Sequence, residues 1–137
     1  AAHALYLTYN PAVRAMLSNV AMARPGAGGR RVLVLGDMLE LGAEAEAAHV
    51  GLAPDIEAAG VSQVFTCGPN MEKLRAALPA PLRAVHAVDS ARLAQRVVEG
   101  LRAGDVVAVK GSLGSKMKVV VDAILAMGAV GGGPGKG

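Results

Sequence analysis

The chain has 137 residues, a length that suits one domain with its own hydrophobic core. Hydrophobic residues make up 53% of it and aromatic residues only 2%, which predicts a core of Ala, Val, Leu and Met and argues against base stacking. The net charge is +3, and the basic residues are scattered, so a solvated surface is expected instead of a nucleic-acid patch. No apolar run approaches the roughly 20 residues of a membrane span. No signal-like segment opens the chain, and we expect a cytoplasmic protein without a membrane partner.

Short apolar segments alternate with segments of helical periodicity. We expect strands at 4–8, 31–35, 61–67, 83–88 and 106–109. The helices between and after them should bury residues spaced three and four apart. These are Val13, Met16, Leu17 and Val20; Met71, Leu74 and Leu78; Leu93, Val97 and Leu101; and Val120, Ile124 and Met127. An alanine-rich helix is also expected over 43–59.

Proline, glycine and aspartate mark the ends of these elements. Pro11 is well placed to open the first helix, Pro54 should kink or divide the helix over 43–59, and Asp89 should cap the helix that follows it. The loop 25–29 is rich in glycine but precedes a strand, whereas a dinucleotide-binding loop follows one, so it is interpreted as a turn. We expect one domain over 1–127 and a disordered glycine-rich tail over 128–137.

The alternation of strands and helices predicts an α/β fold. We expect a doubly wound, mostly parallel six-stranded sheet with helices on both faces. In such sheets, ligands bind beyond the carboxyl ends of the strands. Candidate functional residues are therefore those that follow the apolar strands.

Asp37 and Glu40 follow the strand at 31–35. Their carboxylates could bind an amine, a metal or a ribose. The structural alternative is that Asp37 caps the turn and Glu40 is solvated. The sequence leaves both interpretations open.

Lys110, Gly111 and Ser112 follow the strand at 106–109. The glycines of this loop allow close approach of a ligand, and the lysine suits a phosphate or carboxylate. The alternative is a plain turn with a solvated lysine. The spacing differs from G-x-x-x-x-G-K-[ST], which is absent from the chain, so no site for ATP turnover is predicted here.

Three further positions have a functional and a structural interpretation. Glu46 and His49 stand three apart on a helix, a spacing that metal sites use, but without a second pair a surface or interdomain contact is favoured. Asn10, after Tyr9, could face a ligand at the sheet edge or simply begin a helix. Cys67, the only cysteine, ends an apolar run and is interpreted as a buried thiol instead of a nucleophile.

Taken together, the motifs are more specific than any one of them. They are Tyr9-Asn10-Pro11, Gly36-Asp37-Met38-Leu39-Glu40-Leu41-Gly42 with His49 downstream, Gly68-Pro69, and Val109-Lys110-Gly111-Ser112. In this order they resemble the C-terminal domain of the Mur ligases, above all the branch that adds D-alanyl-D-alanine. The resemblance spans roughly residues 5 to 127. The sequence departs from the family at the shortened Tyr9-Asn10-Pro11 motif and at Leu113, where the family has arginine.

The resemblance implies a Rossmann-like third domain of an ATP-dependent amide ligase of peptidoglycan precursor synthesis. In the family, an N-terminal domain binds UDP-MurNAc-tripeptide, and a central domain holds the P-loop, ATP and magnesium. The third domain closes over the central one and helps bind the incoming D-alanyl-D-alanine. The resemblance implies that Tyr9 and Asn10 lie near the nucleotide, and that Asp37, Glu40, His49, Lys110, Gly111 and Ser112 line the substrate cleft. No catalytic or metal-binding residue is expected in this domain, which alone should be inactive.

Other functions remain open from the sequence. The chain could be a stand-alone module that holds a small anion, or a non-catalytic interaction domain. The short Asn-Pro motif is also similar to that of folylpolyglutamate synthases, whereas the Gly36–Gly42 stretch favours the D-alanyl-D-alanine-adding branch.

Overall fold

Five strands form a single parallel sheet in a computed structural model that describes residues 3–6, 13–37, 49–111 and 116–127. The strands are β1 (His3–Tyr6), β2 (Arg31–Gly36), β3 (Gln63–Cys67), β4 (Arg83–Ala87) and β5 (Val106–Lys110). Their order across the sheet is β1-β5-β2-β3-β4, and every neighbouring pair is parallel. The α/β class expected from the sequence is confirmed.

The expectation of six strands is wrong for the described residues, which contain five. A strand in the middle of a parallel sheet needs an apolar run of about five residues, because both of its faces are covered. Each of the five apolar runs identified in the sequence forms one strand. The described segments between them form helices and turns, so they supply no sixth strand.

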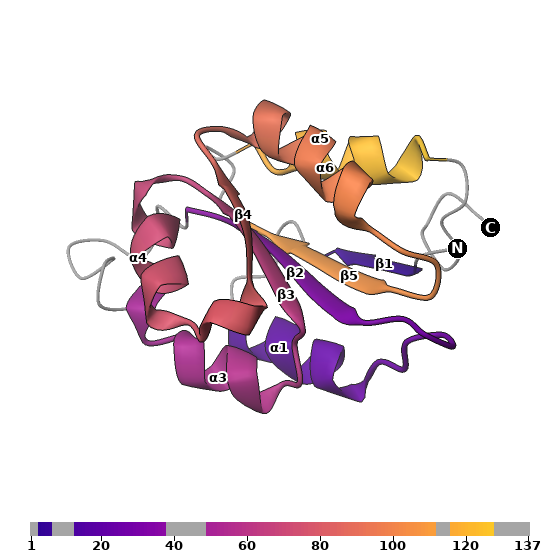
Figure 1. The fold of residues 1–137 in the computed structure, drawn as a ribbon, viewed down its shortest axis with the longest axis horizontal. Coiled ribbons are helices and arrows are strands. Elements are labelled where there is room, and N and C mark those ends of the chain that lie inside the picture. The colour runs from indigo at the N-terminus through magenta and orange to yellow at the C-terminus, as the bar shows by residue number, and fades with distance from the viewer. Residues whose placement is uncertain (1–2, 7–12, 38–48, 112–115, 128–137) are drawn as a thin grey trace.

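Helices cover both faces of the sheet (Figure 1). On one face lie α1 (Val13–Met22), α3 (Ala53–Ala58) and α4 (Pro69–Ala77), and on the other lie α5 (Ser90–Gly100) and α6 (Lys118–Leu125). The short helix η2 (Ala80–Leu82) precedes β4. The chain advances from β1 through β2 and β3 to β4, and then returns to β5. Right-handed crossovers put the helices of the advance on one face and the helix of the return on the other.

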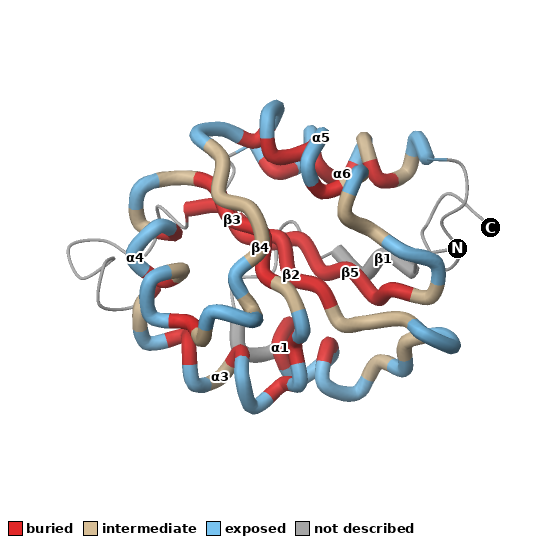
Figure 2. The backbone as a smooth tube through the Cα atoms, in the orientation of Figure 1, coloured by how far each residue is buried: buried red, intermediate tan, exposed pale blue. Residues whose placement is uncertain are grey.

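Each face of the sheet packs against its own hydrophobic core. Alternate residues of one strand contribute to different cores, as Leu33 and Val34 of β2 do. The first core joins Leu35, Val64 and Ala108 to Met16, Val20, Ile56, Met71 and Leu74; the second joins Phe65, Val107 and Val109 to Leu93, Val97, Val120 and Ile124. Figure 2 shows that the central strands are buried along their length, while β4 is only partly covered.

Most of the helix predictions are confirmed. The inward residues that the structure describes are buried, apart from Leu101, which is only partly buried at the end of α5, and Met127. Met127 is 37% exposed, because α6 already ends at Leu125. Pro54 lies in the first turn of α3 and so begins a new helix, as expected. Asp89 caps α5 by accepting a hydrogen bond from the backbone N–H of Arg92.

Two arginines at strand starts bind the ends of helices. The Nε of Arg31 donates to the carbonyl of Val20 at 2.9 Å, and its Nη2 donates to Ala23 at 2.9 Å, near the end of α1. The Nε of Arg83 donates to Leu78 at 2.9 Å, just after α4. Helix ends leave carbonyl groups without partners, and a guanidinium satisfies several of them. Arg31 is partly buried by these contacts, whereas Arg83 stays exposed, as expected for a solvated basic residue.

The glycine-rich loop 25–29 lies against the turn before β5. The backbone N–H of Gly26 donates to the carbonyl of Gly104 at 2.8 Å, and Arg30 directly after the loop binds Asp105. A Cβ on Gly29 would collide with the backbone of Gly104, so glycine is required there by close packing. The loop thus joins two strand starts, in line with its interpretation as a turn.

None of the helices in the described segments is both long enough and apolar enough to cross a membrane.

Candidate functional site

The carboxyl ends of β2 and β5 form the natural ligand edge of this sheet. The two strands are neighbours, with Leu35 in register with Lys110. The chain leaves β2 toward α3 on one face and leaves β5 toward α6 on the other face. Between two strands whose connections diverge in this way, parallel α/β sheets have a crevice in which ligands bind. Asp37 and Gly111, which follow these strands directly, lie at this switch point.

Asp37 is almost completely buried and binds the start of α4. Its Oδ1 accepts a hydrogen bond from the backbone N–H of Met71 at 3.0 Å. Its Oδ2 accepts from the backbone N–H and the side-chain Nδ2 of Asn70, each at 3.3 Å. The structure thus shows Asp37 as a cap, but the helix that it caps follows the neighbouring strand β3, and the bonded Asn70 lies 33 positions further along the chain.

Gly68 leaves room for this carboxylate. As the N-cap of α4, it has no side chain with which to cap its own helix, and its φ of 101° is unfavourable for other residues. A Cβ at this position would lie 2.5 Å from Oδ1 of Asp37. The conformation of Gly68 and the position of Asp37 therefore depend on each other.

Lys110 is the last residue of β5 and is only 3% exposed. The alternation of the strand puts it on the same face as Ala108, toward the first core. The alternative of a solvated lysine is thus wrong. Gly111, which follows, is also buried. At such a depth an ionic contact with an anion is stronger than on the surface, because water screens it poorly.

His49 is fully buried, which overturns its interpretation as a surface residue. It lies in a short helical turn ahead of α3, and the break before α3 separates it from Pro54. No group of three or more His, Cys, Asp or Glu side chains that could share a metal ion occurs within the described ranges.

Several predicted site residues lie outside the described residues. They are Tyr9, Asn10, Glu40, Glu46 and Ser112. Of the predicted set, the structure places Asp37, Lys110 and Gly111 at the ends of two adjacent strands, and His49 in the covering layer ahead of α3.

Sequence reasoning missed a polar pair at the next two strand ends. Oγ1 of Thr66 and Nδ1 of His86 share a hydrogen bond of 2.8 Å, and the two residues are in register between β3 and β4. Thr66 is fully buried. A polar residue near the end of an apolar strand was a usable signal for Thr66, but its partner depended on strand order.

Cys67 is buried and unpaired with another cysteine, which confirms the prediction of a buried thiol. Its Sγ lies 3.8 Å from Sδ of Met117, the N-cap of α6. Burial first, and then the negative charges of Asp37 and Asp89, raise the pKa of the thiol to about 11. A thiol that is protonated at neutral pH is a poor nucleophile, so Cys67 links the end of β3 to α6 by packing.

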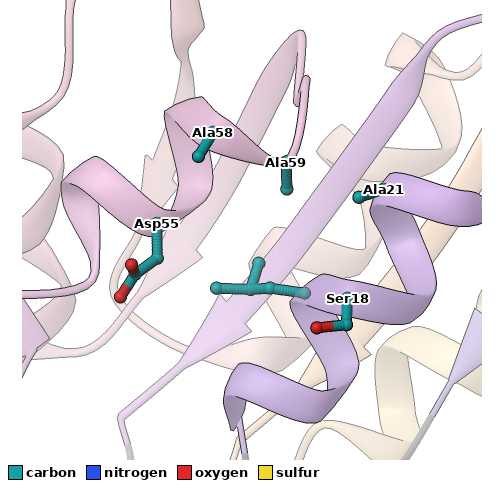
Figure 3. Close-up of a pocket in the computed structure, with 6 residues that line it drawn as sticks. Ser18, Ala21, Asp55, Ala58 and Ala59 are labelled. Atoms are coloured by element: carbon teal, nitrogen blue, oxygen red, sulfur yellow. The ribbon is translucent and has the colours of Figure 1, made fainter.

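A groove of about 260 Å³ lies between α1 and α3. Figure 3 shows Ser18 and Ala21 of α1 on one side and Asp55, Ala58 and Ala59 of α3 on the other. None of these residues belongs to the predicted site. The groove is therefore separate from the ligand edge at β2 and β5.

Proteins to which this chain is similar, in sequence and in fold, are Mur ligases. Residues 2–113 match the family model "Mur ligase, glutamate ligase domain". A curated protein of Escherichia coli strain K12, the UDP-N-acetylmuramoyl-tripeptide–D-alanyl-D-alanine ligase, is 37% identical over 98 residues. The match covers 70% of this chain and 21% of that protein, so the chain spans about a fifth of the length of this relative.

Solved structures share the fold. The MurF ligase of Thermotoga maritima in complex with ADP matches with a TM-score of 0.66 and 21% identity, over 88% of this chain and 27% of that one. MurF of Acinetobacter baumannii matches with a TM-score of 0.66 and 16% identity, over 90% and 28%. The family model covers most of the chain and includes both strand ends of the ligand edge. The chain therefore belongs to the Mur ligase family, as a member of its C-terminal, glutamate ligase domain.

Proposed function

We propose that this chain is the C-terminal domain of a MurF-type, ATP-dependent ligase of peptidoglycan precursor synthesis. In this proposal, the crevice between β2 and β5 helps bind the incoming D-alanyl-D-alanine and closes over ATP held by a central domain. One observation carries the proposal: a buried lysine, Lys110, ends a strand at the topological switch point of a Mur ligase domain. The similarity to the E. coli D-alanyl-D-alanine ligase suggests the substrate.

The described residues fit an anionic group. Lys110 supplies a charge for a carboxylate or phosphate oxygen, and Gly111 allows the ligand to approach the backbone closely. Glu40 and Ser112, outside the described residues, are proposed for the same cleft, and Tyr9 and Asn10 for its nucleotide side. His49 is proposed to support the cleft from the buried layer ahead of α3.

ATP and magnesium supply the chemistry when they are bound: phosphorylation of the precursor's carboxylate activates it for attack by an amine. The chain contains no G-x-x-x-x-G-K-[ST] motif, and its described residues offer no three-ligand group for a metal. Its own task is therefore to bind and orient. Its proposed partners are the N-terminal and central domains of the ligase, D-alanyl-D-alanine and UDP-MurNAc-tripeptide, in the cytoplasm.

The test is an NMR titration of the isotope-labelled chain with D-alanyl-D-alanine and, separately, with an ATP analogue and magnesium. Amide shifts at Gly36, Asp37, Lys110 and Gly111 that disappear in Lys110→Met are expected. Lys118→Met is the matched control, since the Lys118 side chain is 80% exposed and lies on α6. L-Glutamate serves as the competing ligand that a folylpolyglutamate synthase would bind.

Enzyme kinetics of the whole ligase decide the case if the domain alone binds weakly. Lys110→Met should raise the KM for D-alanyl-D-alanine by about tenfold or more, because a charged hydrogen bond is lost. An unchanged KM and kcat in Lys110→Met would overturn the assignment of Lys110. Binding of L-glutamate but not of D-alanyl-D-alanine would overturn the proposed substrate.

A further inference from the structure

We propose that Asp37 is a positioning residue of the crevice: its carboxylate caps α4 and occupies the anion-binding end of that helix, and it does not serve as the ligand of the substrate's ammonium group. The inference deepens the proposed function and takes the identity of the substrate from it. It assigns a role to a residue whose motif position alone also suits direct substrate binding. The geometry around Asp37, Gly68 and the first turn of α4 carries the argument.

Both oxygens of Asp37 are engaged by α4. Oδ1 accepts from the N–H of Met71 and Oδ2 from the N–H of Asn70, at 3.0 and 3.3 Å. Nδ2 of Asn70 adds a third donor at 3.3 Å. The first turn of a helix carries backbone N–H groups without partners and the positive end of the helix dipole. A carboxylate with only 7% exposure gains most from such donors, because little water competes with them.

The cap has to come from β2, because α4 cannot supply its own. The N-cap of α4 is Gly68, which has no side chain, and Pro69 follows it in the first turn. The register of the sheet pairs Gly36 with Cys67, which brings the next residue of each strand, Asp37 and Gly68, side by side. A Cβ on Gly68 would lie 2.5 Å from Oδ1 and 2.6 Å from Cγ of Asp37. A glycine N-cap and a carboxylate from the neighbouring strand together form one capping unit.

This unit has a consequence for ligand binding. The N-terminus of a helix beside a strand end is a common site for phosphate or carboxylate groups. Here the carboxylate of Asp37 already occupies that position at α4. An anionic group of a ligand is therefore directed toward Lys110 at the end of β5. Asp37 acts on the ligand indirectly, by fixing the exit of β2 against α4.

The chain contains a matched control for this cap. Asp89 also caps a helix, accepting from the N–H of Arg92 at 2.9 Å, but it is the N-cap of its own helix, α5. Its side chain is 49% exposed, so water can replace it when it is removed. Both aspartates thus cap a helix. Asp37 is buried and caps a helix from a neighbouring strand, whereas Asp89 is exposed and caps its own helix.

The first experiment compares thermal unfolding of Asp37→Ala, Asp37→Asn and Asp89→Ala without any ligand. Asp37→Ala should lower the Tm by roughly 10 °C, more than Asp89→Ala, because a buried helix end loses its cap. Asp37→Asn should lose less than Asp37→Ala, since one oxygen can still accept from the N–H of Met71, although the amide nitrogen cannot accept from Asn70. Sodium formate, which replaces the deleted carboxylate, should raise the Tm of Asp37→Ala relative to sodium chloride at equal ionic strength. It should not do so for Asp89→Ala.

The inference is overturned if formate restores Asp37→Ala no better than Asp89→Ala. If Asp37→Ala does not fold, the comparison of Asp37→Asn with the wild type decides. The Met71 amide resonance is then expected to lie downfield in both the wild type and Asp37→Asn, because an oxygen still accepts from it. Loss of that shift would contradict the capping role.

The second experiment separates this inference from the proposed function. In the whole ligase, Asp37→Asn should leave the KM for D-alanyl-D-alanine within about threefold of the wild type, whereas loss of an ammonium ligand should raise it about tenfold or more. A large rise in KM with an intact Tm would show that Asp37 binds the substrate and would overturn the inference. If the wild-type chain binds no dipeptide while formate rescue succeeds, the proposed function fails and the capping role stands.

Discussion

Arg30 and Asp105, 75 positions apart in the chain, bind each other through a two-pronged contact at the amino end of the sheet. Nη2 of Arg30 lies 2.7 Å from Oδ2 of Asp105, and its Nε lies 3.2 Å from Oδ1. The same Nη2 donates to the carbonyl of Gly100 at the end of α5. The pair thus joins the start of β2, the turn before β5 and the end of α5. Its aspartate side chain is fully buried, so its charge depends on these donors.

Replacing Arg30 with methionine should lower the free energy of unfolding by about 3 kcal/mol, because Asp105 then stays buried without its cation. Urea unfolding followed by circular dichroism measures this loss. Arg96→Met is the control: Arg96 and Glu99 are 57% and 71% exposed on α5 and lie 3.5 Å apart. That exposed pair should contribute less than about 1 kcal/mol. Equal effects of the two substitutions would contradict the structural role of Arg30.

The same pair predicts a dependence of stability on pH. Burial by itself raises the pKa of Asp105, but hydrogen bonds from the Arg30 side chain and from the backbone N–H groups of Arg102 and Arg30 outweigh it, and the charge of Arg30 adds to them. The pKa therefore lies below its usual value of 3.8. A carboxyl group with a lowered folded-state pKa stabilises the protein above its unfolded-state pKa. This contribution is lost as the pH falls through the folded-state pKa.

Unfolding free energies measured across the acidic range should therefore fall below about pH 4 in the wild type. The Asp105→Asn variant should be less stable at neutral pH and should show a shallower acid dependence. An acid dependence equal to that of the wild type would mean that other carboxyl groups account for it.

Gly68→Ala should destabilise the chain more than Gly28→Ala. Both residues have positive φ values, 101° and 76°, but a Cβ on Gly28 meets nothing within 4 Å, whereas one on Gly68 collides with Asp37. We expect a loss of about 1 kcal/mol for Gly28→Ala and about 3 kcal/mol for Gly68→Ala. A double-mutant cycle with Asp37→Ala isolates the collision from the backbone strain. The cost of Gly68→Ala should shrink by about 1 to 2 kcal/mol in that background.

Cys67 should react slowly with thiol reagents. Its pKa of about 11, compared with 9.0 for an ordinary thiol, lowers the thiolate fraction about 100-fold at pH 8, and burial slows access further. Labelling with 5,5′-dithiobis(2-nitrobenzoic acid) should be at least 100-fold faster in denaturant than in buffer. Rapid labelling of the folded chain would contradict the burial of Cys67.

The same thiol affects stability at alkaline pH. Because the folded-state pKa of Cys67 is raised, the protonated thiol stabilises the fold below pH 9, and this contribution is lost between about pH 9 and 11. The Cys67→Ser variant should show a weaker loss of stability over that pH range.

Local patterns in the sequence predicted the elements and the faces that they bury. The five apolar runs became the five strands, and Pro54 and Asp89 mark helix starts as expected. The described residues form five strands and not the six expected, one for each apolar run. These features follow from neighbouring residues: apolar spacing, a capping side chain or a proline ring acts within a few positions of itself.

What only the tertiary structure decided is which distant residues meet. The return of β5 between β1 and β2 creates the switch point and makes Leu35 and Lys110 neighbours. Lys110 and His49 are also buried in the folded chain, although a polar residue in isolation prefers water.

The sequence by itself determined the α/β class, the helix faces and the motifs that mark the Mur ligase family. The tertiary structure determined that Asp37 caps α4 and that Arg30 pairs with Asp105. The physical reason is the range of the interactions. Periodicity and capping depend on residues a few positions apart, whereas these contacts join residues 34 and 75 positions apart, and they exist only once many weak packing contacts have fixed the order of the strands.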